Sequence, residues 1–184
     1  MITVLRLQYV NLLKQYTNCI YNKFTKEKEQ LRLGYFSNSV PKDLIRDFEN
    51  REISRDEISS FILKRLQEVK NEEIFLGYTT IGPHRDDFEI YVDDKKAKLF
   101  ASQGQQRSAV LSLKLAESEI IEKICKRKPV ILLDDVMSEL DSQRQDFILN
   151  SISNRQVFIT CCDPSAIAKM TSGKTFEVKN GKIT

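Results

Sequence analysis

The sequence predicts an α/β fold in which a mostly parallel sheet with flanking helices follows a helical arm. Helical periodicity dominates residues 1–76, with one short strand among the helices. From residue 106 onward, helix and strand patterns alternate, which is typical of a parallel sheet with right-handed crossovers. Within that part, Val130–Asp135 reads V-I-L-L-D-D, and four consecutive apolar residues fit a strand buried on both faces. We therefore expect an arm region at 1–76 and an α/β region at 77–184.

The arm region is predicted to hold three helices and a strand. Residues 1–26 carry an apolar seam, typical of a helix that lies along another helix. The seam consists of Ile2, Leu5, Tyr9, Leu12, Tyr16 and Cys19. Because it starts without an N-cap signal, we expect that its partner is an upstream part of a longer protein or that it packs on the helices that follow. Gln30–Phe36 alternates as a strand does, residues 39–48 form a short helix, and Ser54 with Glu57 makes a capping box for a third helix.

The α/β region is predicted to begin with a loop and two strands. Residues 78–85 contain Gly and Pro and should form the loop. The strands are Phe88–Val92 and Ala97–Ala101, joined by a polar turn. A long helix then runs from about Gln106 to Cys125. Its apolar stripe consists of Ala109, Leu113, Ala116, Ile120 and Ile124.

After the V-I-L-L-D-D strand, the pattern continues as helix, strand, helix and hairpin. Ser142 and Gln145 are expected to cap the first of these helices. Gln156–Thr160 is strand-like, and a short helix should start at Pro164. Asn180-Gly181 is a dipeptide typical of a tight hairpin turn.

Length and composition limit the class of protein. A chain of 184 residues with 41% hydrophobic residues can build one packed domain or slightly more. The net charge of +3 is too small to indicate a nucleic-acid partner by itself. His84 is the only histidine and none of the four cysteines forms a C-x-x-C pair, so we expect no zinc site. Without a signal peptide or a long apolar run, the protein is expected to be soluble, cytoplasmic and without a membrane partner.

Two segments carry chemistry. Ser102–Arg107 is a turn rich in hydroxyl and amide groups before the long helix, and free N–H groups at a helix start can bind an anion. Taken alone, it fits a simple polar N-cap equally well. Asp134 and Asp135 end the apolar strand, where open α/β sheets bind their ligands. A cation would relieve the repulsion between these carboxylates, although a solvated acidic turn is the alternative.

Four motifs in order resemble the RecF family, the SMC-like ABC ATPases of bacterial DNA repair. They are G-P-H-R-D-D (Gly82–Asp87), A-S-Q-G-Q-Q-R (Ala101–Arg107), L-K-L-A-E (Leu113–Glu117) and L-L-D-D-V-M-S-E-L-D (Leu132–Asp141). The resemblance is densest over residues 79–164. It implies the C-terminal half of an ABC-type P-loop ATPase lobe, with signature motif, Walker B strand and D-loop, preceded by a helical arm.

The resemblance also implies residue roles. Asp134 would hold Mg²⁺ through water, and Asp135, where most ABC ATPases carry a glutamate, would be catalytic and orient the attacking water. The groups expected at the γ-phosphate of ATP on a second subunit are Ser102, Gln103, Gly104 and Gln105, with Ser138 and Asp141 across the same dimer interface. Thr160 stands where many ABC proteins carry a switch histidine, and since a hydroxyl cannot carry a proton as imidazole does, we expect slow, switch-like hydrolysis. His84 and Arg85 are candidates for that interface or for a purely structural loop.

The sequence contains no convincing phosphate loop. Gly173-Lys174-Thr175 mimics the end of G-x-x-x-x-G-K-[ST], but Ala168 holds the first glycine position and a strand follows where a helix is needed. RecF proteins carry this loop near the N-terminus, so the resemblance implies that the chain is a C-terminal portion and inactive alone.

For the whole protein, the resemblance implies ATP and Mg²⁺ as cofactors and an ATP-dependent homodimer. Its partners would be DNA, at single-strand gaps and on duplex, and the proteins RecO, RecR and RecA. Its processes would be recombinational repair, replication-gap repair and the SOS response. The alternatives are another SMC-like ATPase with a long coiled coil, and a non-enzymatic DNA-binding or adaptor domain.

Overall fold

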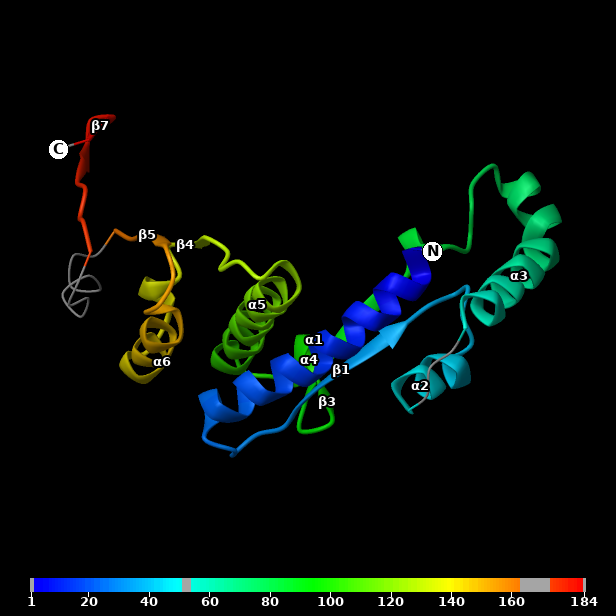
Figure 1. Cartoon of the computed structure of the whole chain (residues 1–184), viewed down its shortest axis with the longest axis horizontal. Coiled ribbons are helices and arrows are strands. Elements are labelled where there is room, and N and C mark those ends of the chain that lie inside the picture. Colours follow the sequence, from blue (N-terminus) through cyan, green and yellow to red (C-terminus); the bar gives the residue numbers. More distant parts are fainter. Residues whose placement is uncertain (1, 51–53, 163–172, 184) are drawn as a thin grey trace. The chain divides into compact units, whose positions relative to one another are not determined.

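The structure is a computed structural model that describes residues 2–50, 54–162 and 173–183. It contains two compact units, residues 1–127 and 128–184, and each is described by itself (Figure 1). The predicted division at residues 76 and 77 lies inside the first unit and stays a prediction. Within the described ranges, no helix has both the length and the apolar composition needed to cross a membrane.

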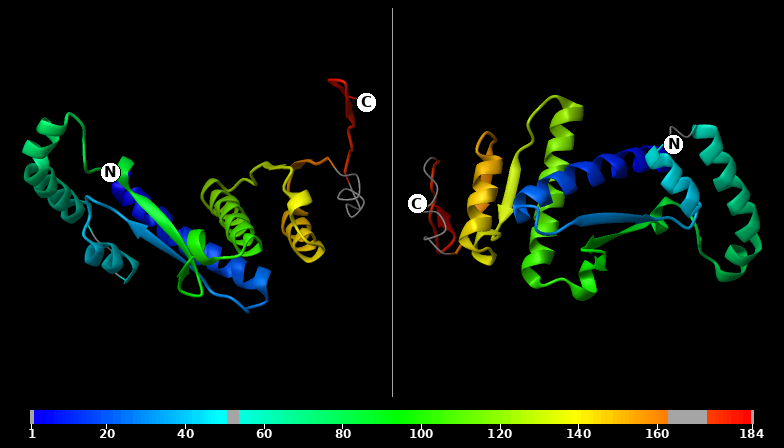
Figure 2. Two further views of the ribbon diagram at one scale, coloured as in Figure 1. Left: turned by 180° about the vertical axis from the view of Figure 1, so that it is seen from behind. Right: turned by 90° about the horizontal axis from the view of Figure 1, so that it is seen from below.

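The first unit combines helices with a three-stranded antiparallel sheet. Its helices are α1 Ile2–Thr25, α2 Lys42–Asn50, α3 Arg55–Leu76, α4 Ala97–Phe100 and α5 Gln103–Cys125. Its strands are β1 Leu31–Phe36, β2 Asp87–Val92 and β3 Lys95–Lys96, in the order β1-β2-β3. β1 pairs with β2 along its whole length, and α1 lies beside both α5 and β1 (Figure 2).

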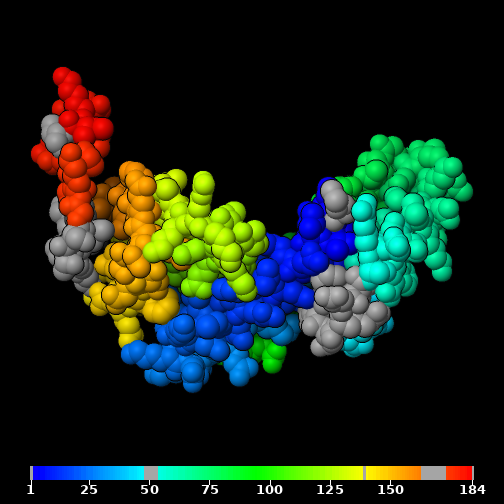
Figure 3. Space-filling model, viewed as in Figure 1, coloured from blue at the N-terminus to red at the C-terminus, as the bar shows by residue number. Residues whose placement is uncertain are grey.

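One part of the core of this unit joins α1, β1, α2 and α3. Its buried cluster consists of Leu7, Tyr35, Val40, Leu44, Ile45 and Ile58. Alternate residues of β1 supply one buried face, as the period of a strand requires. The buried residues of α3 are Ile58 and Val69, and most of its other side chains are exposed at the surface (Figure 3). The helix is capped as predicted, because the Ser54 hydroxyl accepts a hydrogen bond from the N–H of Glu57 at 3.1 Å.

The apolar seam predicted for residues 1–26 is not the buried face of α1. Ile2 and Leu5 are 61% and 57% exposed, and Cys19 is exposed. The buried residues of this helix are Thr3, Leu7, Leu13, Thr17, Ile20 and Tyr21. Since α1 packs against both α5 and β1, its buried face is wider than the single seam of a paired helix and includes threonines.

The middle of α5 agrees with its predicted stripe, whereas its ends differ. The helix begins at Gln103, earlier than the predicted Gln106. Its buried residues are Ser108, Ala109, Ser112, Leu113, Ala116, Ser118 and Ile120. These are mostly small, which allows close packing. Ile124, the last member of the predicted stripe, is 62% exposed.

The predicted strand Ala97–Ala101 is wrong, because the second strand of the hairpin is only Lys95–Lys96 and helix α4 begins at Ala97. Asp93 and Asp94 both have positive φ, 47° and 61°, as a two-residue hairpin turn requires. β3 therefore pairs directly after the turn and ends at Lys96. The next residues form the short helix α4, which starts at the buried Ala97.

The second unit contains a parallel pair of strands connected by a helix. Its elements are β4 Ile131–Asp134, α6 Ser142–Ile152 and β5 Val157–Thr160, followed by a hairpin of β6 Val178–Lys179 and β7 Lys182–Ile183. β4 and β5 pair in parallel, from Ile131 opposite Val157 to Asp134 opposite Thr160, which confirms the predicted parallel arrangement. The hairpin turns at Asn180 and Gly181 as predicted. The helix predicted from Pro164 lies outside the described residues.

The expectation that the V-I-L-L strand is buried on both faces is wrong within the described residues. Leu132 is 73% exposed and its neighbour on β5, Phe158, is 55% exposed, whereas Leu133 is half-buried. Exposure alternates along both strands, because in this part of the chain the sheet has only two strands and one helix crossing between them.

Ile120 provides a test of the α5 packing. Its side chain is 0% exposed, so Ile120→Ala should lower the free energy of unfolding by about 3 kcal/mol through lost burial and the cavity left behind. The matched control Ile124→Ala, on the same helix but largely exposed, should change it by less than about 0.5 kcal/mol. Urea denaturation followed by far-ultraviolet circular dichroism measures both. Equal losses in the two variants would contradict this arrangement of α5.

Candidate functional site

The carboxyl ends of β4 and β5 bring three predicted site residues together. The parallel register sets Asp134 beside Thr160, and the Thr160 hydroxyl donates a hydrogen bond to Oδ1 of Asp134. The N–H of Asp135 donates both to the carbonyl of Thr160 and to its hydroxyl oxygen, each at 3.1 Å. One hydroxyl therefore accepts from the backbone of one aspartate while it donates to the carboxylate of the other.

Ser138 joins this group from the turn that follows β4. Its hydroxyl lies 2.8 Å from the carbonyl oxygen of Asp135 and 2.9 Å from Oδ1 of the same residue, and it can donate to either. Asp135 has a φ of 50°, in the left-handed region that few residues other than glycine adopt. Such backbone conformations persist where surrounding contacts hold them, and they cluster at functional sites. Ser138 and Thr160 supply those contacts here.

Asp141 caps the N-terminus of α6, a role that the sequence pattern assigned to Ser142. It is the N-cap of α6, and its side chain accepts a hydrogen bond from the N–H of Arg144 at 2.9 Å. The predicted cap at Ser142 is therefore wrong by one position. The backbone hydrogen bond from Arg144, together with its guanidinium, holds the pKa of Asp141 below its ordinary value.

The turn between β4 and α6 is tied to the helix. Met137 begins a short 3₁₀ turn that ends at Glu139, and its side chain is 1% exposed. The side-chain amide of Gln145 donates to the carbonyl of Met137 at 2.8 Å. A buried anchor and this hydrogen bond thus fix the turn that carries Ser138.

The oxygen atoms of this cluster fit a magnesium nucleotide better than a metal held by protein alone. Asp134 and Asp135 are both exposed, and they are joined by hydroxyls, not by further carboxylates. No group of three or more acidic, histidine or cysteine side chains able to hold a metal occurs among the described residues. Mg²⁺ is commonly bound by one or two carboxylates with water and substrate phosphates as its other ligands. The donor set of Asp134 fits that pattern.

In the first unit, Ser102–Gln105 forms a complete capping box at the start of α5. The Ser102 hydroxyl accepts from the N–H of Gln105 at 3.2 Å, and the N–H of Ser102 donates to the Gln105 side chain at 2.9 Å. The Gln105 amide also donates to Glu29 at 3.0 Å. Both ends of the Gln105 side chain are therefore engaged, whereas Ser102 and Gln103 are exposed and Gly104 has no side chain. The N–H groups of the first helical turn have no acceptor inside the helix and point at whatever lies before it.

The loop that carries His84 and Arg85 is fixed from within the first unit. His84 shares a hydrogen bond of 3.0 Å with the Thr79 hydroxyl, and the Arg85 guanidinium donates to the Thr79 carbonyl at 2.9 and 3.2 Å. Gly82 has a φ of 131°, and a Cβ there would lie 2.9 Å from the His84 ring, so only glycine fits. Both predicted interface candidates thus have structural partners, and their part in an interface stays a prediction.

Asp86 has a buried side chain in this loop, and the sequence did not predict its burial or its partners. Its side chain is 1% exposed and is paired with Arg6 of α1 at 3.3 Å. The Tyr35 hydroxyl donates to the same oxygen, Oδ2, whereas the buried Oδ1 has no hydrogen-bond partner within the described residues. Arg6 also donates to the carbonyl of Pro83. The two adjacent aspartates of the G-P-H-R-D-D motif were a possible signal, because neighbouring residues in extended backbone point in opposite directions. The sequence alone does not show that Asp86 is the buried one and Asp87 the exposed one.

The predicted site residues therefore form sets in two separate units. Asp134, Asp135, Ser138 and Thr160 meet in the second unit, with Asp141 at the start of the next helix. Ser102–Gln105 and the pair His84 and Arg85 belong to the first unit, and each set is described by itself.

Comparison with known proteins adds a family to this geometry. No protein-family model matches the chain. The DNA replication and repair protein RecF of Clostridium perfringens is 40% identical over 183 residues, which is 97% of this chain and 46% of that protein. RecF of Ruminiclostridium cellulolyticum is 48% identical over 130 residues, 70% of this chain and 35% of that protein. The chain belongs to the RecF family.

Solved RecF structures show the same fold. A structure of the recombination mediator protein RecF-ATPrS in the RecFOR pathway covers 99% of this chain with a TM-score of 0.79 and 32% identity. A structure of RecF-ATP from the same pathway covers 98% with a TM-score of 0.77 and 30% identity. The chain spans about half the length of the RecF proteins it matches, 46% and 45% of these two chains. The α/β fold and the resemblance to a C-terminal portion of RecF are thus confirmed.

Tyr35 makes the buried Asp86 contact testable through pH. Burial, reinforced by the hydrogen bond to Asp86, raises the pKa of Tyr35 above its ordinary value of 10.0. Because the folded pKa exceeds the unfolded one, this contribution to stability is complete below about pH 10 and is lost as the pH rises further. Tyr35→Phe should lower the free energy of unfolding by about 2 kcal/mol at pH 8 and flatten its fall between about pH 10 and 11. Urea denaturation across this range measures it, and Tyr78→Phe, at an exposed tyrosine, should keep the original pH dependence.

Proposed function

We propose that this chain is part of an ATP-dependent DNA-binding protein of recombinational and replication-gap repair. The observation that carries the proposal is the hydrogen-bonded group of Asp134, Asp135, Ser138 and Thr160 at the ends of two parallel strands. Similarity to RecF over nearly the whole chain supports it, as does similarity to the solved structure of RecF-ATP.

In the proposed reaction, Asp134 and Asp135 have different roles. Asp134, whose Oδ1 accepts from Thr160, would hold Mg²⁺ through water with its other oxygen. When bound, the ion would neutralise charge on the phosphates of ATP. Asp135 would orient the attacking water, with its carboxylate directed by Ser138 and its backbone by Thr160. Phosphoryl transfer depends on positioning and charge neutralisation more than on covalent catalysis, which suits this set of groups.

Thr160 would set the rate of this reaction. Its hydroxyl already accepts one hydrogen bond and donates another, to the two aspartates. A threonine in this state can hold the carboxylates in place, but it cannot take up and return a proton near neutral pH, as a histidine can. We therefore propose slow hydrolysis that acts as a switch between a DNA-bound and a released state.

The start of α5 would complete the site of a second subunit. The capping box uses the N–H of Gln105, so the backbone donors suited to a γ-phosphate are the N–H groups of Gln103 and Gly104. Ser102 and Gln103 are exposed beside them, and Gly104 allows close approach of the backbone. Gln105 would act indirectly, since its side chain already serves Ser102 and Glu29. Nucleotide would then bridge two subunits, with Asp141 and Ser138 across the same interface.

The remaining parts of the proposal concern the whole protein. It would form an ATP-dependent homodimer on DNA, at single-strand gaps and on duplex, and assist RecO and RecR in loading RecA. ATP would bind a phosphate loop that the 184 residues of this sequence do not contain. An adaptor domain without ATPase activity is the competing function, and the second experiment below separates the two.

The chain by itself should neither bind Mg-ATP tightly nor hydrolyse it. Without a loop of backbone N–H groups and a lysine around the β- and γ-phosphates, the carboxylates alone repel the nucleotide. Isothermal titration of the 184-residue chain with Mg-ATP should give no heat of tight binding. A dissociation constant in the micromolar range would show that the chain contains a phosphate loop that its sequence does not reveal.

Asp135→Asn should trap the ATP-bound dimer of a RecF-family protein that carries both this region and a phosphate loop. Removal of the carboxylate should slow hydrolysis by about 100-fold while ATP still bridges the subunits. Light scattering after size-exclusion chromatography with ATP measures the dimer, and phosphate release measures hydrolysis. Asp56→Asn, the same change at an exposed position on α3, is the control. If Asp135→Asn behaves like this control, the domain is an adaptor and the catalytic assignment fails.

A further inference from the structure

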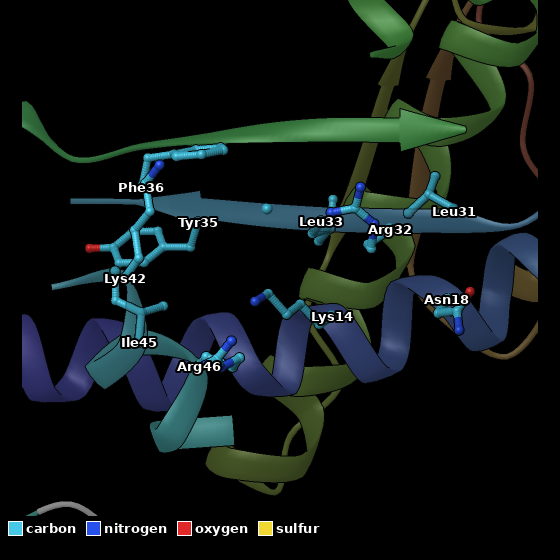
Figure 4. Close-up of a pocket in the computed structure, with 11 residues that line it drawn as sticks. Lys14, Asn18, Leu31, Arg32, Leu33, Tyr35, Phe36, Lys42, Ile45 and Arg46 are labelled. Carbon is cyan, nitrogen blue, oxygen red and sulfur yellow. The ribbon is translucent and has the colours of Figure 1, made fainter. Parts of the chain in front are cut away.

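A groove lined by positively charged side chains lies between β1, α1 and α2 in the first unit. Its volume is about 410 Å³, and Lys14, Arg32, Lys42 and Arg46 supply its charged side chains (Figure 4). No carboxylate lines it. The cations come from three separate elements that the fold of the arm brings together.

A second groove of about 480 Å³ adjoins the first, because Lys42 lines both. It adds Lys64 and Arg65 of α3, together with one carboxylate, Glu68, and the polar loop that begins at Ser37. The two grooves together are called the basic tract below. Its cations are Lys14, Arg32, Lys42, Arg46, Lys64 and Arg65.

The basic tract is far more positively charged than the chain as a whole. The sequence has 29 basic and 26 acidic residues, close to balance. An average surface would therefore offer about as many carboxylates as cations, whereas Glu68 is the one carboxylate that lines the two grooves beside six cations. Asp43 and Asp94 pair with two of these cations, Arg46 and Arg32, but do not line the grooves. A concentration of one sign in a groove indicates a polyanionic ligand.

The ion pairs that these cations make are weak enough to exchange. Arg65 pairs with Glu68 at 2.7 Å, but both side chains are about half exposed. Arg46 pairs with Asp43 at 3.2 Å, with both side chains largely exposed. Arg32 pairs with Asp94 at 3.3 Å, again between exposed side chains. Exposed ion pairs add little stability, so a phosphate can replace the carboxylate at small cost.

Aromatic side chains in the basic tract favour a single strand over a duplex. Phe36 lines the first groove and is partly exposed, and Phe61 lines the second and is 40% exposed. Proteins that bind single-stranded nucleic acids combine a positive groove for the backbone with aromatic rings on which unpaired bases stack. A paired duplex cannot offer its bases to rings inside a groove.

The backbone of β1 adds hydrogen-bond donors along the same groove. β1 is an edge strand, paired only with β2 among the described strands. The carbonyl of Gln30 accepts from Asp93 in that pairing, so by the alternation of antiparallel strands the N–H groups of Leu31 and Leu33 point away from β2. Both residues line the first groove.

We propose that the basic tract of the arm binds a single strand of nucleic acid, with its phosphates on the six cations and unpaired bases on Phe36 and Phe61. The proposal deepens the DNA binding proposed above and rests on it. It assigns that binding to residues that are dispersed in the sequence and gathered only by the fold.

The test compares two triple variants of the 184-residue chain that lose the same charge. One variant, Lys14→Gln, Lys42→Gln and Lys64→Gln, removes cations of the basic tract. The control, Lys28→Gln, Lys70→Gln and Lys98→Gln, removes exposed lysines that do not line it. Fluorescence anisotropy with a labelled oligothymidylate of about 20 nucleotides, longer than a typical binding site, gives the affinity at several salt concentrations. Circular dichroism confirms that each variant is folded, and the single change Lys42→Gln serves if the triple is not.

The expected result is a change in the salt dependence of the first variant alone. Each lost phosphate contact lowers the slope of log affinity against log salt by about 0.7 on a single strand, so three contacts lower it by about 2 and Lys42→Gln by about 0.7. The control keeps the original slope. Phe61→Leu should weaken binding of the oligothymidylate by about tenfold and leave binding of a duplex of the same length unchanged.

Several outcomes would overturn the proposal, and they are distinguishable. Equal losses in both triple variants would mean that net charge, and not the basic tract, binds the strand. A loss of poly-glutamate binding in the first variant, with oligothymidylate binding intact, would assign the tract to an acidic peptide. A stronger effect of the first variant on duplex than on single strand would contradict the stacking role of Phe36 and Phe61. No oligothymidylate or duplex binding by the unchanged chain would reject both this proposal and the DNA binding of this region.

Discussion

The hydroxyl of Thr160 is the contact on which the geometry of the second unit depends. It lies at the end of β5, beside the end of β4, because the two strands are parallel and in register. It donates to the Asp134 carboxylate and accepts from the N–H of Asp135, so both acidic residues have a fixed place although they are exposed. The hydrogen bonds from Asp135 to Thr160 and from Ser138 to Asp135 hold the left-handed backbone of Asp135. The chain then enters the turn that the buried Met137 anchors.

The features that the sequence predicted well depend on local pattern or on parallel pairing. The parallel pair β4 and β5 follows from apolar runs on either side of a helix, and it sets Asp134 beside Thr160 without any side-chain information. The capping box at Ser102 is likewise readable from neighbouring residues. The roles of these residues in ATP chemistry came from the resemblance to RecF, and for them the structure supplies positions.

The features that the sequence predicted poorly depend on tertiary contacts. Of the two expectations for the seam at Ile2 and Leu5, packing on the helices that follow is wrong, because α1 packs against α5 and β1 through another face, which buries Thr17. A partner for the exposed seam in an upstream part of a longer protein stays a prediction. Asp141 and Ser142 are both good N-caps, and only the backbone geometry before α6 decides between them. The burial of Asp86 required knowledge of Arg6 and Tyr35, which lie in distant parts of the sequence.

The basic tract shows why net charge is a poor guide to the partners of this chain. A total of +3 hides the tract, because acidic residues elsewhere offset its cations. At ordinary ionic strength, exposed charges separated by more than about 8 Å are largely screened. A phosphate at Lys42 therefore responds to nearby charges, which are the cations lining the same groove and the exposed Asp43 paired with Arg46, and hardly to distant carboxylates. Local charge therefore determines where a nucleic acid binds, and the fold determines local charge by bringing α1, β1, α2 and α3 together. The surface is therefore created as the burial of Asp86 is, by contacts between residues that lie far apart in the sequence.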